Sequence, residues 1–260
     1  MGILNVTEDS FFEDSRALDD TSLLKKAKSM LEAGADILDV GACSTRPGSI
    51  APAVETEATR LVHALNLLKK EFPQSTLSAD TYRASVAEAA IQAGASIIND
   101  ISGSTLDKAM IDVLEKHKVT YVLMHIQGEP ATMQINPGYQ DVCKEVYHHL
   151  EQSILELQKR NISDIIIDPG FGFGKTIEHN YTLLHHLESF HALGYPLLCG
   201  FSRKGMIHKV LESDAEGALN GTTVLNTIAL LKGASILRVH DVKEAVEVRT
   251  LVDRFLQPSR

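Results

Sequence analysis

Short apolar runs alternate with longer stretches of helical period along the whole chain. The runs are rich in aliphatic and β-branched residues, and turn-forming residues separate them from the helical stretches. This alternation is typical of repeated βα units on a parallel sheet. We predict eight strands, each followed by a helical segment, at residues 2–5, 36–40, 76–80, 96–99, 120–125, 164–168, 196–200 and 235–239.

A weak internal repeat supports this division. The sequence Ala-Gly-Ala-Asp-Ile at 33–37 recurs as Ala-Gly-Ala-Ser-Ile at 93–97, and Gly-Ala-Ser-Ile follows at 233–236. In each copy the glycine is expected to end one helix just before the next strand. Before the first copy, Leu23, Leu24, Ala27, Met30 and Leu31 fall on one face of a predicted helix that ends at Gly34.

Eight βα units in 260 residues favour an α/β fold of the (β/α)₈ TIM barrel type. An open doubly wound sheet usually has fewer strands and a GxGxxG fingerprint after the first, which this chain lacks. No linker or low-complexity run divides the chain. We therefore predict a single domain over residues 1–260.

Composition narrows the classes of partner. The chain carries 25 basic and 34 acidic side chains, a formal net charge of −9, which argues against nucleic acid as a ligand. No apolar run is long enough for a membrane span, so we expect no membrane partner. Three cysteines, Cys43, Cys143 and Cys199, form no CxxC pair and no zinc spacing, which favours a reducing cytoplasm.

Polar residues occur where each predicted strand ends. In a (β/α)₈ barrel the active site lies at the carboxyl ends of the strands. A single polar residue in such a place is commonly a helix N-cap, but polar residues at every strand indicate a ligand site. They are Asn5, Asp39, Asp80, Asn99, Asp100, His125 and Asp168, then Ser202, Arg203 and Lys204 after strand seven, and Arg238 and His240 after strand eight.

Three of the segments after strands have a composition suited to ligands. The loop at 41–48 combines small residues with Arg46 and Pro47, and is interpreted either as an anion loop or as an ordinary Pro-Gly turn. The segment at 168–176 fails the P-loop pattern because residue 169 is proline. It presents Phe171 and Phe173, which suit an aromatic ligand or pack locally. The cations after strands seven and eight occupy the usual phosphate position of the fold.

Taken together, these segments resemble the dihydropteroate synthase family. The matching segments are 1–7, Ser-Thr-Arg-Pro-Gly at 44–48, Ser-Ala-Asp-Thr at 78–81, Ile-Asn-Asp at 98–100, Met-His at 124–125, 168–175, Ser-Arg-Lys at 202–204 and Arg-Val-His-Asp at 238–241. The resemblance implies a (β/α)₈ barrel, usually a homodimer. It also implies a transferase that joins 6-hydroxymethyl-7,8-dihydropterin diphosphate to 4-aminobenzoate with Mg²⁺.

The resemblance also implies a role for each matching residue. Asp80, Asn99, Asp168, Lys204 and Arg238 correspond to the pterin site, and Asp80, Lys204 and Arg46 to catalysis. The diphosphate is expected at Asn5, Arg46, Arg238 and His240, with Asn5 as the magnesium ligand. The pocket for 4-aminobenzoate, and for competing sulfonamides, is expected at Thr45, Pro47, Phe171 and Ser202.

The chain departs from the family pattern in its first two loops. Residues 8–15 lack the usual proline and two glycines, and Ala42 and Cys43 replace a frequent Gly-Glu. Two alternatives therefore stay open. One is a catalytically silent pterin-binding paralogue. The other is a methyltetrahydrofolate-dependent methyltransferase domain, which shares the pterin-binding barrel but does not account for the segments at 44–48 and 238–241.

Overall fold

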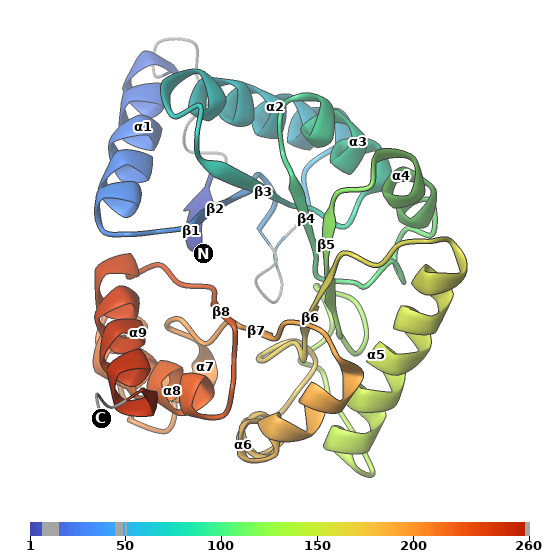
Figure 1. Ribbon diagram of the computed structural model, residues 1–260, viewed down its shortest axis with the longest axis vertical. Coiled ribbons are helices and arrows are strands. Elements are labelled where there is room, and N and C mark those ends of the chain that lie inside the picture. Colours follow the sequence, from blue (N-terminus) through green and yellow to red (C-terminus); the bar gives the residue numbers. More distant parts are fainter. Residues whose placement is uncertain (7–15, 45–48, 50, 258–260) are drawn as a thin grey trace.

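Strands and helices alternate along the chain, and the helices surround the strands (Figure 1). The structure, a computed structural model, describes residues 1–6, 16–44, 49 and 51–257, with only the backbone of residues 16–19. The elements are β1 (Gly2–Asn5), α1 (Arg16–Glu32), β2 (Ile37–Gly41), α2 (Val54–Glu71), β3 (Thr76–Asp80), α3 (Ala84–Gln92), β4 (Ile97–Asp100), α4 (Met110–His117), β5 (Thr120–Met124), α5 (Val142–Lys159), β6 (Ile165–Asp168), α6 (Ile177–His185), the 3₁₀ helix η2 (Leu187–Leu193), β7 (Leu198–Cys199), α7 (Gly205–His208), α8 (Leu219–Leu231), β8 (Ile236–Leu237) and α9 (Val242–Leu256).

The strands close into a ring. Strands β1 to β6 form one parallel sheet in chain order, and β7 pairs with β8. Two single bridges join the pair to the sheet, Ile167 with Leu197 on one side and Gly2 with Val239 on the other. All eight predicted strands are present and the (β/α)₈ barrel is confirmed.

The prediction for strands seven and eight was too long. Each was expected to span five residues, at 196–200 and 235–239, and each has two. Pro196 has no amide hydrogen to donate to a neighbouring strand, although its carbonyl accepts from Ile167. On the other strand, the amides of Ser235 and Ile236 both donate to the Leu197 carbonyl, so the regular ladder is interrupted.

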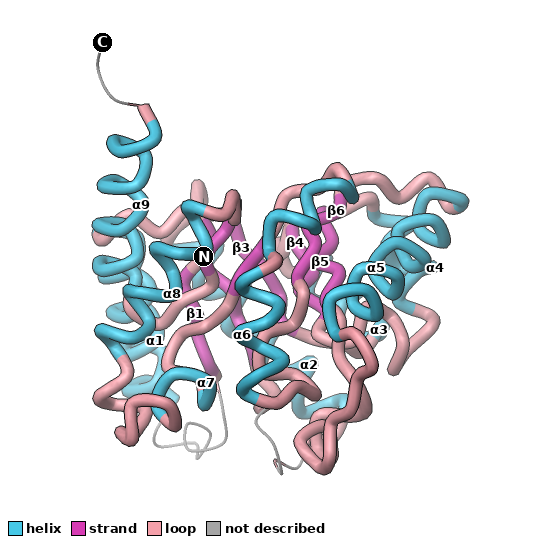
Figure 2. Tube along the Cα trace, turned by 90° about the horizontal axis from the view of Figure 1, so that it is seen from below, coloured by secondary structure: helices cyan, strands magenta, loops and turns pink. Residues whose placement is uncertain are grey.

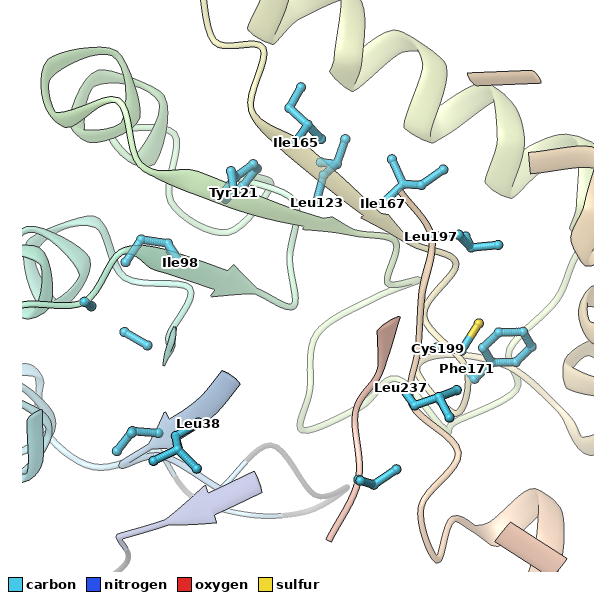
Figure 3. Close-up of a cluster of buried hydrophobic side chains, with 14 of the residues drawn as sticks. Leu38, Ile98, Tyr121, Leu123, Ile165, Ile167, Phe171, Leu197, Cys199 and Leu237 are labelled. Atoms are coloured by element: carbon cyan, nitrogen blue, oxygen red, sulfur yellow. The ribbon is translucent and has the colours of Figure 1, made fainter. Parts of the chain in front are cut away.

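Alternation along the strands separates two layers of side chains. Tyr121, Leu123, Ile165 and Ile167 pack toward the helices in the main apolar core (Figure 3). The residues between them point into the barrel, because successive side chains of a strand face opposite ways. A second apolar cluster fills the interior, with Met1, Ile97, Val122, Ile166 and Leu198. The polar residues at the strand ends lie in the next layer of the barrel interior, on the carboxyl side of this apolar cluster.

The helices follow the predicted pattern where their apolar stripe is strong. In α5 the buried residues are Val142, Val146, Leu150, Ile154 and Leu157, a stripe of helical period. In α1, Ala27 and Met30 are buried, and Leu23, Leu24 and Leu31 are half-buried against the core. All three repeat glycines, Gly34, Gly94 and Gly233, have positive φ at the turn before the next strand, as predicted.

Two helices rather than one connect β6 to β7, and two also connect β7 to β8. The chain forms α6 and then η2 after β6, and the four-residue α7 and then α8 after β7. Figure 2 shows the helices standing around the strands, with α9 on the outside. No helix in the described residues is long and apolar enough to cross a membrane.

Candidate functional site

The predicted site residues meet at one end of the barrel. Asn5, Asp80 and Asp168 are the last residues of β1, β3 and β6, and Asn99 is the penultimate residue of β4. Ser202 and Lys204 follow β7, and Arg238 and His240 follow β8. Thr45, Arg46 and Pro47, together with residues 8–15 of the first loop, lie outside the described residues.

A buried acid–base network crosses the mouth of the barrel. The Nε of Arg238 donates to Asp39 Oδ2 at 2.6 Å, and its NH2 donates to Asp80 Oδ2 at 2.6 Å. Among the described residues, the remaining NH1 of Arg238 has no hydrogen-bond partner. Burial raises the pKa of Asp80 to about 7, and the Arg238 charge opposes this rise. Arg238 is therefore fixed as a planar cation with one free edge for a ligand.

Asp39 determines how the Asn99 amide is oriented at the mouth of the barrel. Its Oδ2 also accepts from Asn99 Nδ2 at 3.0 Å, and its Oδ1 accepts from Ser78 at 2.6 Å. An ionised carboxylate only accepts hydrogen bonds, so the Asn99 amide must turn its NH₂ toward Asp39. Its oxygen is then left for a donor on a ligand. Sequence reasoning noted Asp39 at a strand end but gave it no role, although strand alternation places it on the same face as Asn99.

Lys175 stabilises the glycine-rich loop after β6 through hydrogen bonds of its ammonium group. Lys175 Nζ lies 2.9 Å from the Gly170 carbonyl, 3.1 Å from the Phe173 carbonyl and 2.9 Å from Nδ1 of His125. At Gly170 (φ +73°) a side chain would collide with the backbone of His125, so the loop passes closely over β5. The Gly170 amide donates to Asp168 Oδ1 at 2.7 Å, which fixes that carboxylate.

The charges beneath this loop are strongly perturbed by burial. Burial raises the pKa of Asp168, opposed by the nearby Lys204 charge. It lowers the pKa of Lys175 to about 7 and that of Lys204 to about 8. His125 has its pKa lowered to about 2 by burial and is neutral, so its Nδ1 accepts from Lys175. A ligand gains binding free energy when it supplies hydrogen-bond partners to buried ionisable groups such as these.

Phe171 belongs to the apolar core. It lies in the cluster of buried apolar side chains (Figure 3) and is 1% exposed. Its ring packs against Phe201, with 4.5 Å between the ring centroids. The expected contact between this ring and an aromatic substrate is therefore not available, because the ring belongs to the core. Its carbonyl instead accepts from Lys204 Nζ at 2.5 Å, and Lys204 lies 4.7 Å from the centre of the half-buried Phe173 ring.

The cations after β7 and β8 divide into two groups. Lys204, Arg238 and His240 lie at the mouth, as expected. Arg203 was counted with them as a cation at the phosphate position, but its guanidinium is engaged by both carboxylate oxygens of Asp241. His240 Nδ1 lies 2.9 Å from Ser202 Oγ, and burial lowers the pKa of His240 to about 4.

The residues present fit a magnesium ion bound mainly by its ligand. Asn5 is exposed at the end of β1, and its amide has no hydrogen-bond partner among the described residues. No group of three or more His, Cys, Asp or Glu that could enclose a metal exists in that part of the chain. One neutral oxygen suits Mg²⁺, which keeps waters and phosphate oxygens as its other ligands.

The three cysteines are free thiols, as expected from their spacing. Cys199 is buried, while Cys43 and Cys143 are half-buried. Burial raises the pKa of Cys43 to about 11, so it is not a nucleophile at neutral pH.

Known proteins resemble the chain over nearly its full length. A sequence profile described as pterin binding enzyme matches residues 1–240. The dihydropteroate synthase of Escherichia coli is 40% identical over 258 residues, 98% of this chain and 91% of that protein. The Bacillus subtilis enzyme is 38% identical, covering 98% of this chain and 88% of its own length.

Solved structures agree with the sequence match. A Yersinia pestis dihydropteroate synthase with a sulfonamide drug complex superimposes with a TM-score of 0.92 at 38% identity, covering 98% of this chain and 93% of that one. A Xanthomonas albilineans dihydropteroate synthase with 4-aminobenzoic acid gives 0.90 at 35% identity, covering 100% and 93%. The chain belongs to the pterin-binding enzyme family, among its dihydropteroate synthases.

Proposed function

We propose that this chain condenses 6-hydroxymethyl-7,8-dihydropterin diphosphate with 4-aminobenzoate, giving 7,8-dihydropteroate and diphosphate. The amine nitrogen bonds to the pterin methylene, the C–O bond to diphosphate breaks, and the amine loses one proton. The observation that carries the proposal is the layer of polar side chains at the carboxyl ends of the strands, in a chain that matches dihydropteroate synthases over almost its full length. The whole chain, residues 1–260, acts as one pterin-binding domain.

The pterin ring is bound by groups from three sides of the mouth. Asp168 accepts from the 2-amino group and the neighbouring ring N–H, and Asn99 offers its free amide oxygen to a donor. Lys204 donates to a ring acceptor in place of its present bond to the Phe171 carbonyl. Arg238 covers the ring with its planar guanidinium. Asp168, Asn99 and Arg238 are already held by protein partners, so only Lys204 has to exchange a hydrogen bond when the ring binds.

The reacting bond lies between the acidic and the basic sides of the mouth. Asp80 stabilises positive charge that develops at the methylene carbon as the C–O bond weakens. The free edge of Arg238, neutral His240 and Arg46 receive the departing diphosphate. Magnesium, with Asn5 as its protein ligand, supplies positive charge to the leaving group.

The second substrate is proposed to bind beside Ser202, with Thr45 and Pro47 from the second loop. Phe171 contributes through its backbone rather than its ring. The Yersinia pestis and Xanthomonas albilineans relatives are recorded with a sulfonamide drug and with 4-aminobenzoic acid. We propose that sulfonamides compete with 4-aminobenzoate here as well, and that the enzyme works in the cytoplasm as a homodimer.

Diphosphate release tests the proposal directly. The purified protein is mixed with the pterin diphosphate and Mg²⁺, with and without 4-aminobenzoate. Release that requires Mg²⁺, with dihydropteroate formed only when the amine is present, supports the synthase. Pterin binding without turnover identifies a silent paralogue instead, and transfer of a methyl group from methyltetrahydrofolate identifies a methyltransferase domain.

A further inference from the structure

The segments after β7 and β8 carry much of the site but have little backbone support. Each strand has two residues, and the last ladder bond between them runs from the Arg238 amide to the Cys199 carbonyl at 2.9 Å. Ser202 and Lys204 lie beyond that point on one side, and His240 lies beyond it on the other. Val239, next to His240, still pairs with β1, since its amide donates to the Met1 carbonyl and its carbonyl accepts from the Ile3 amide, both at 2.9 Å. In the described residues, however, no backbone hydrogen bond joins the two segments to each other beyond Arg238, so side-chain contacts must set the position of Ser202 and Lys204 relative to His240.

A salt bridge joins the two segments at this point. Arg203 donates from Nε to Asp241 Oδ2 and from NH2 to Asp241 Oδ1, both at 2.9 Å. Its NH1 donates to the carbonyls of Ala215 and Glu216 at 2.9 and 3.0 Å, which lie in the connection before α8. We call the Arg203–Asp241 pair the clasp. Its guanidinium bonds to two other segments of the chain and so links three segments in all.

Among the described residues, the Asp241 carboxylate makes no hydrogen bond other than those to Arg203. It is the N-cap residue of α9, where an aspartate usually accepts from the first helical amides. Its side chain makes no such bond, and both of its oxygens face Arg203. The carboxylate therefore serves the clasp rather than the helix.

The backbone of Arg203 also departs from ordinary geometry. It has φ +57°, in the left-handed region that residues with a side chain seldom adopt. Its amide donates to Thr222 Oγ1 at 3.1 Å. The residue is thus held in an unfavourable conformation from both its backbone and its side chain, between two site residues, Ser202 and Lys204.

We propose that Arg203 and Asp241 are positioning residues that set the distance between two halves of the ligand site. This inference rests on the proposed function. One half, at Lys204 and Asp168, binds the pterin ring, and the other, at His240, binds the diphosphate. Arg238 is proposed to contact both parts of the ligand. Lys204 adjoins Arg203 and His240 adjoins Asp241, so the clasp joins the two halves one residue away from each.

A ligand that spans both halves senses their spacing, whereas a ligand of one half does not. When two binding groups are linked, the second contact forms at an effective concentration set by geometry, and it is lost if the sites move apart. Opening the clasp should therefore weaken the pterin diphosphate while sparing its separate parts. A general loss of folding would weaken all three ligands together.

Asp241→Ala is the cleaner variant, because it opens the clasp without changing the strained residue. Calorimetry without 4-aminobenzoate compares 6-hydroxymethyl-7,8-dihydropterin, inorganic diphosphate with Mg²⁺, and the intact pterin diphosphate. We expect each part to bind within about twofold of its affinity for the unaltered protein, and the intact ligand to bind at least about tenfold more weakly. Arg203→Ala should behave alike, and the double variant should be no worse than either single one.

Arg160→Ala provides a matched control. This arginine also pairs with two acidic side chains, Asp112 and Glu115, but between helices remote from the mouth. It should leave all three affinities unchanged.

Three outcomes would overturn the clasp. Diphosphate alone losing as much as the intact ligand in Arg203→Ala would make Arg203 an anion ligand. An unchanged affinity for the intact ligand would make the pair irrelevant to the site, and a proportional loss of all three ligands would make it merely structural. Failure of the unaltered protein to bind pterin diphosphate would instead count against the proposed function.

Discussion

Two parts of the barrel rim present site residues in different ways. Asp80 and Asp168 end strands of five and four residues inside a continuous sheet, and Asn99 is the penultimate residue of a four-residue strand in the same sheet. Ser202, Lys204 and His240 follow strands of two residues, joined to the sheet by single bridges. Both sets lie at the same end of the barrel, but a continuous backbone ladder holds only the first set.

This difference shows where side-chain contacts, rather than backbone hydrogen bonds, hold the site residues in position. On the sheet side, the backbone ladder sets the position and one inner network, centred on Asp39, sets side-chain orientation. On the β7–β8 side, a salt bridge and the Ser202–His240 contact replace the missing ladder. A substitution on the sheet side should therefore act on the atom removed, while one on the other side should act on geometry.

Removing the carboxylate of Asp168 should have the largest effect on binding. In the proposed pterin site, Asp168→Ala deletes two hydrogen bonds to the pterin edge from a buried acceptor, each contributing about 1.5–3 kcal/mol. We expect the dissociation constant of 6-hydroxymethyl-7,8-dihydropterin to rise at least about a hundredfold. Calorimetry measures it, with Asp164→Ala, an exposed acid at the start of the same strand, as the control. A change below tenfold would remove Asp168 from the pterin site.

Asp39 should dominate stability on the same side. Asp39→Ala leaves Arg238 with one carboxylate and strands the donors of Asn99 and Ser78, and breaking a buried pair in this way costs about 3–5 kcal/mol. Asp39→Asn keeps an oxygen for Asn99 and Arg238, so it should lose clearly less. Urea unfolding compares the two variants with Asp36→Ala, which breaks only the exposed pair with Arg249. Equal losses in all three variants would contradict a central role for Asp39.

The sequence carries the strands of the sheet side well. Runs such as Ile-Leu-Asp-Val and Ile-Ile-Ile-Asp are apolar on both faces and carry an acid at or next to their ends, and the bounds of these strands were predictable to within one residue. The β7–β8 side has equally apolar runs, yet its strands are shorter than predicted. Hydrophobicity shows that a segment is buried, but not which amides find partners across a closing barrel.

Side-chain partners were the part that the sequence could not give. Arg203 and Lys204 are adjacent cations, and only the fold shows that one is paired with Asp241 while the other faces the cavity. Asp39 and Arg238 are 199 residues apart and meet only because the ring closes. Phe171 and Phe173 differ in the same way, since the turn geometry between Gly170 and Gly174 decides which ring enters the core.

On the β7–β8 side, His240 should make the protein sensitive to acid. Its pKa is lowered from 6.5 to about 4 by burial, so folding opposes its protonation. The stability from the neutral form is complete above pH 6.5 and is lost as the pH falls toward 4, about 1–3 kcal/mol in all. Urea unfolding at pH 7 and pH 4.5 should show a smaller acid loss in His240→Asn than in the unaltered protein. An equal loss in both proteins would show that His240 titrates normally.

The smallest effect is expected from the second contact between the two segments. Ser202→Ala removes the hydroxyl that bonds to both Nδ1 and the backbone amide of His240, two uncharged hydrogen bonds that each contribute about 0.5–1.5 kcal/mol. The KM for 4-aminobenzoate should rise about threefold to tenfold, with kcat little changed, because the proposed function places Ser202 in the pocket for this substrate. Ser189→Ala, which removes an exposed hydroxyl bonded only to the His186 carbonyl, serves as the control in steady-state kinetics. If Ser202→Ala weakened binding of the intact pterin diphosphate as much as Asp241→Ala does, the Ser202 hydroxyl would hold the two segments together as firmly as the salt bridge. The prediction that the salt bridge contributes more than the hydroxyl would then be wrong.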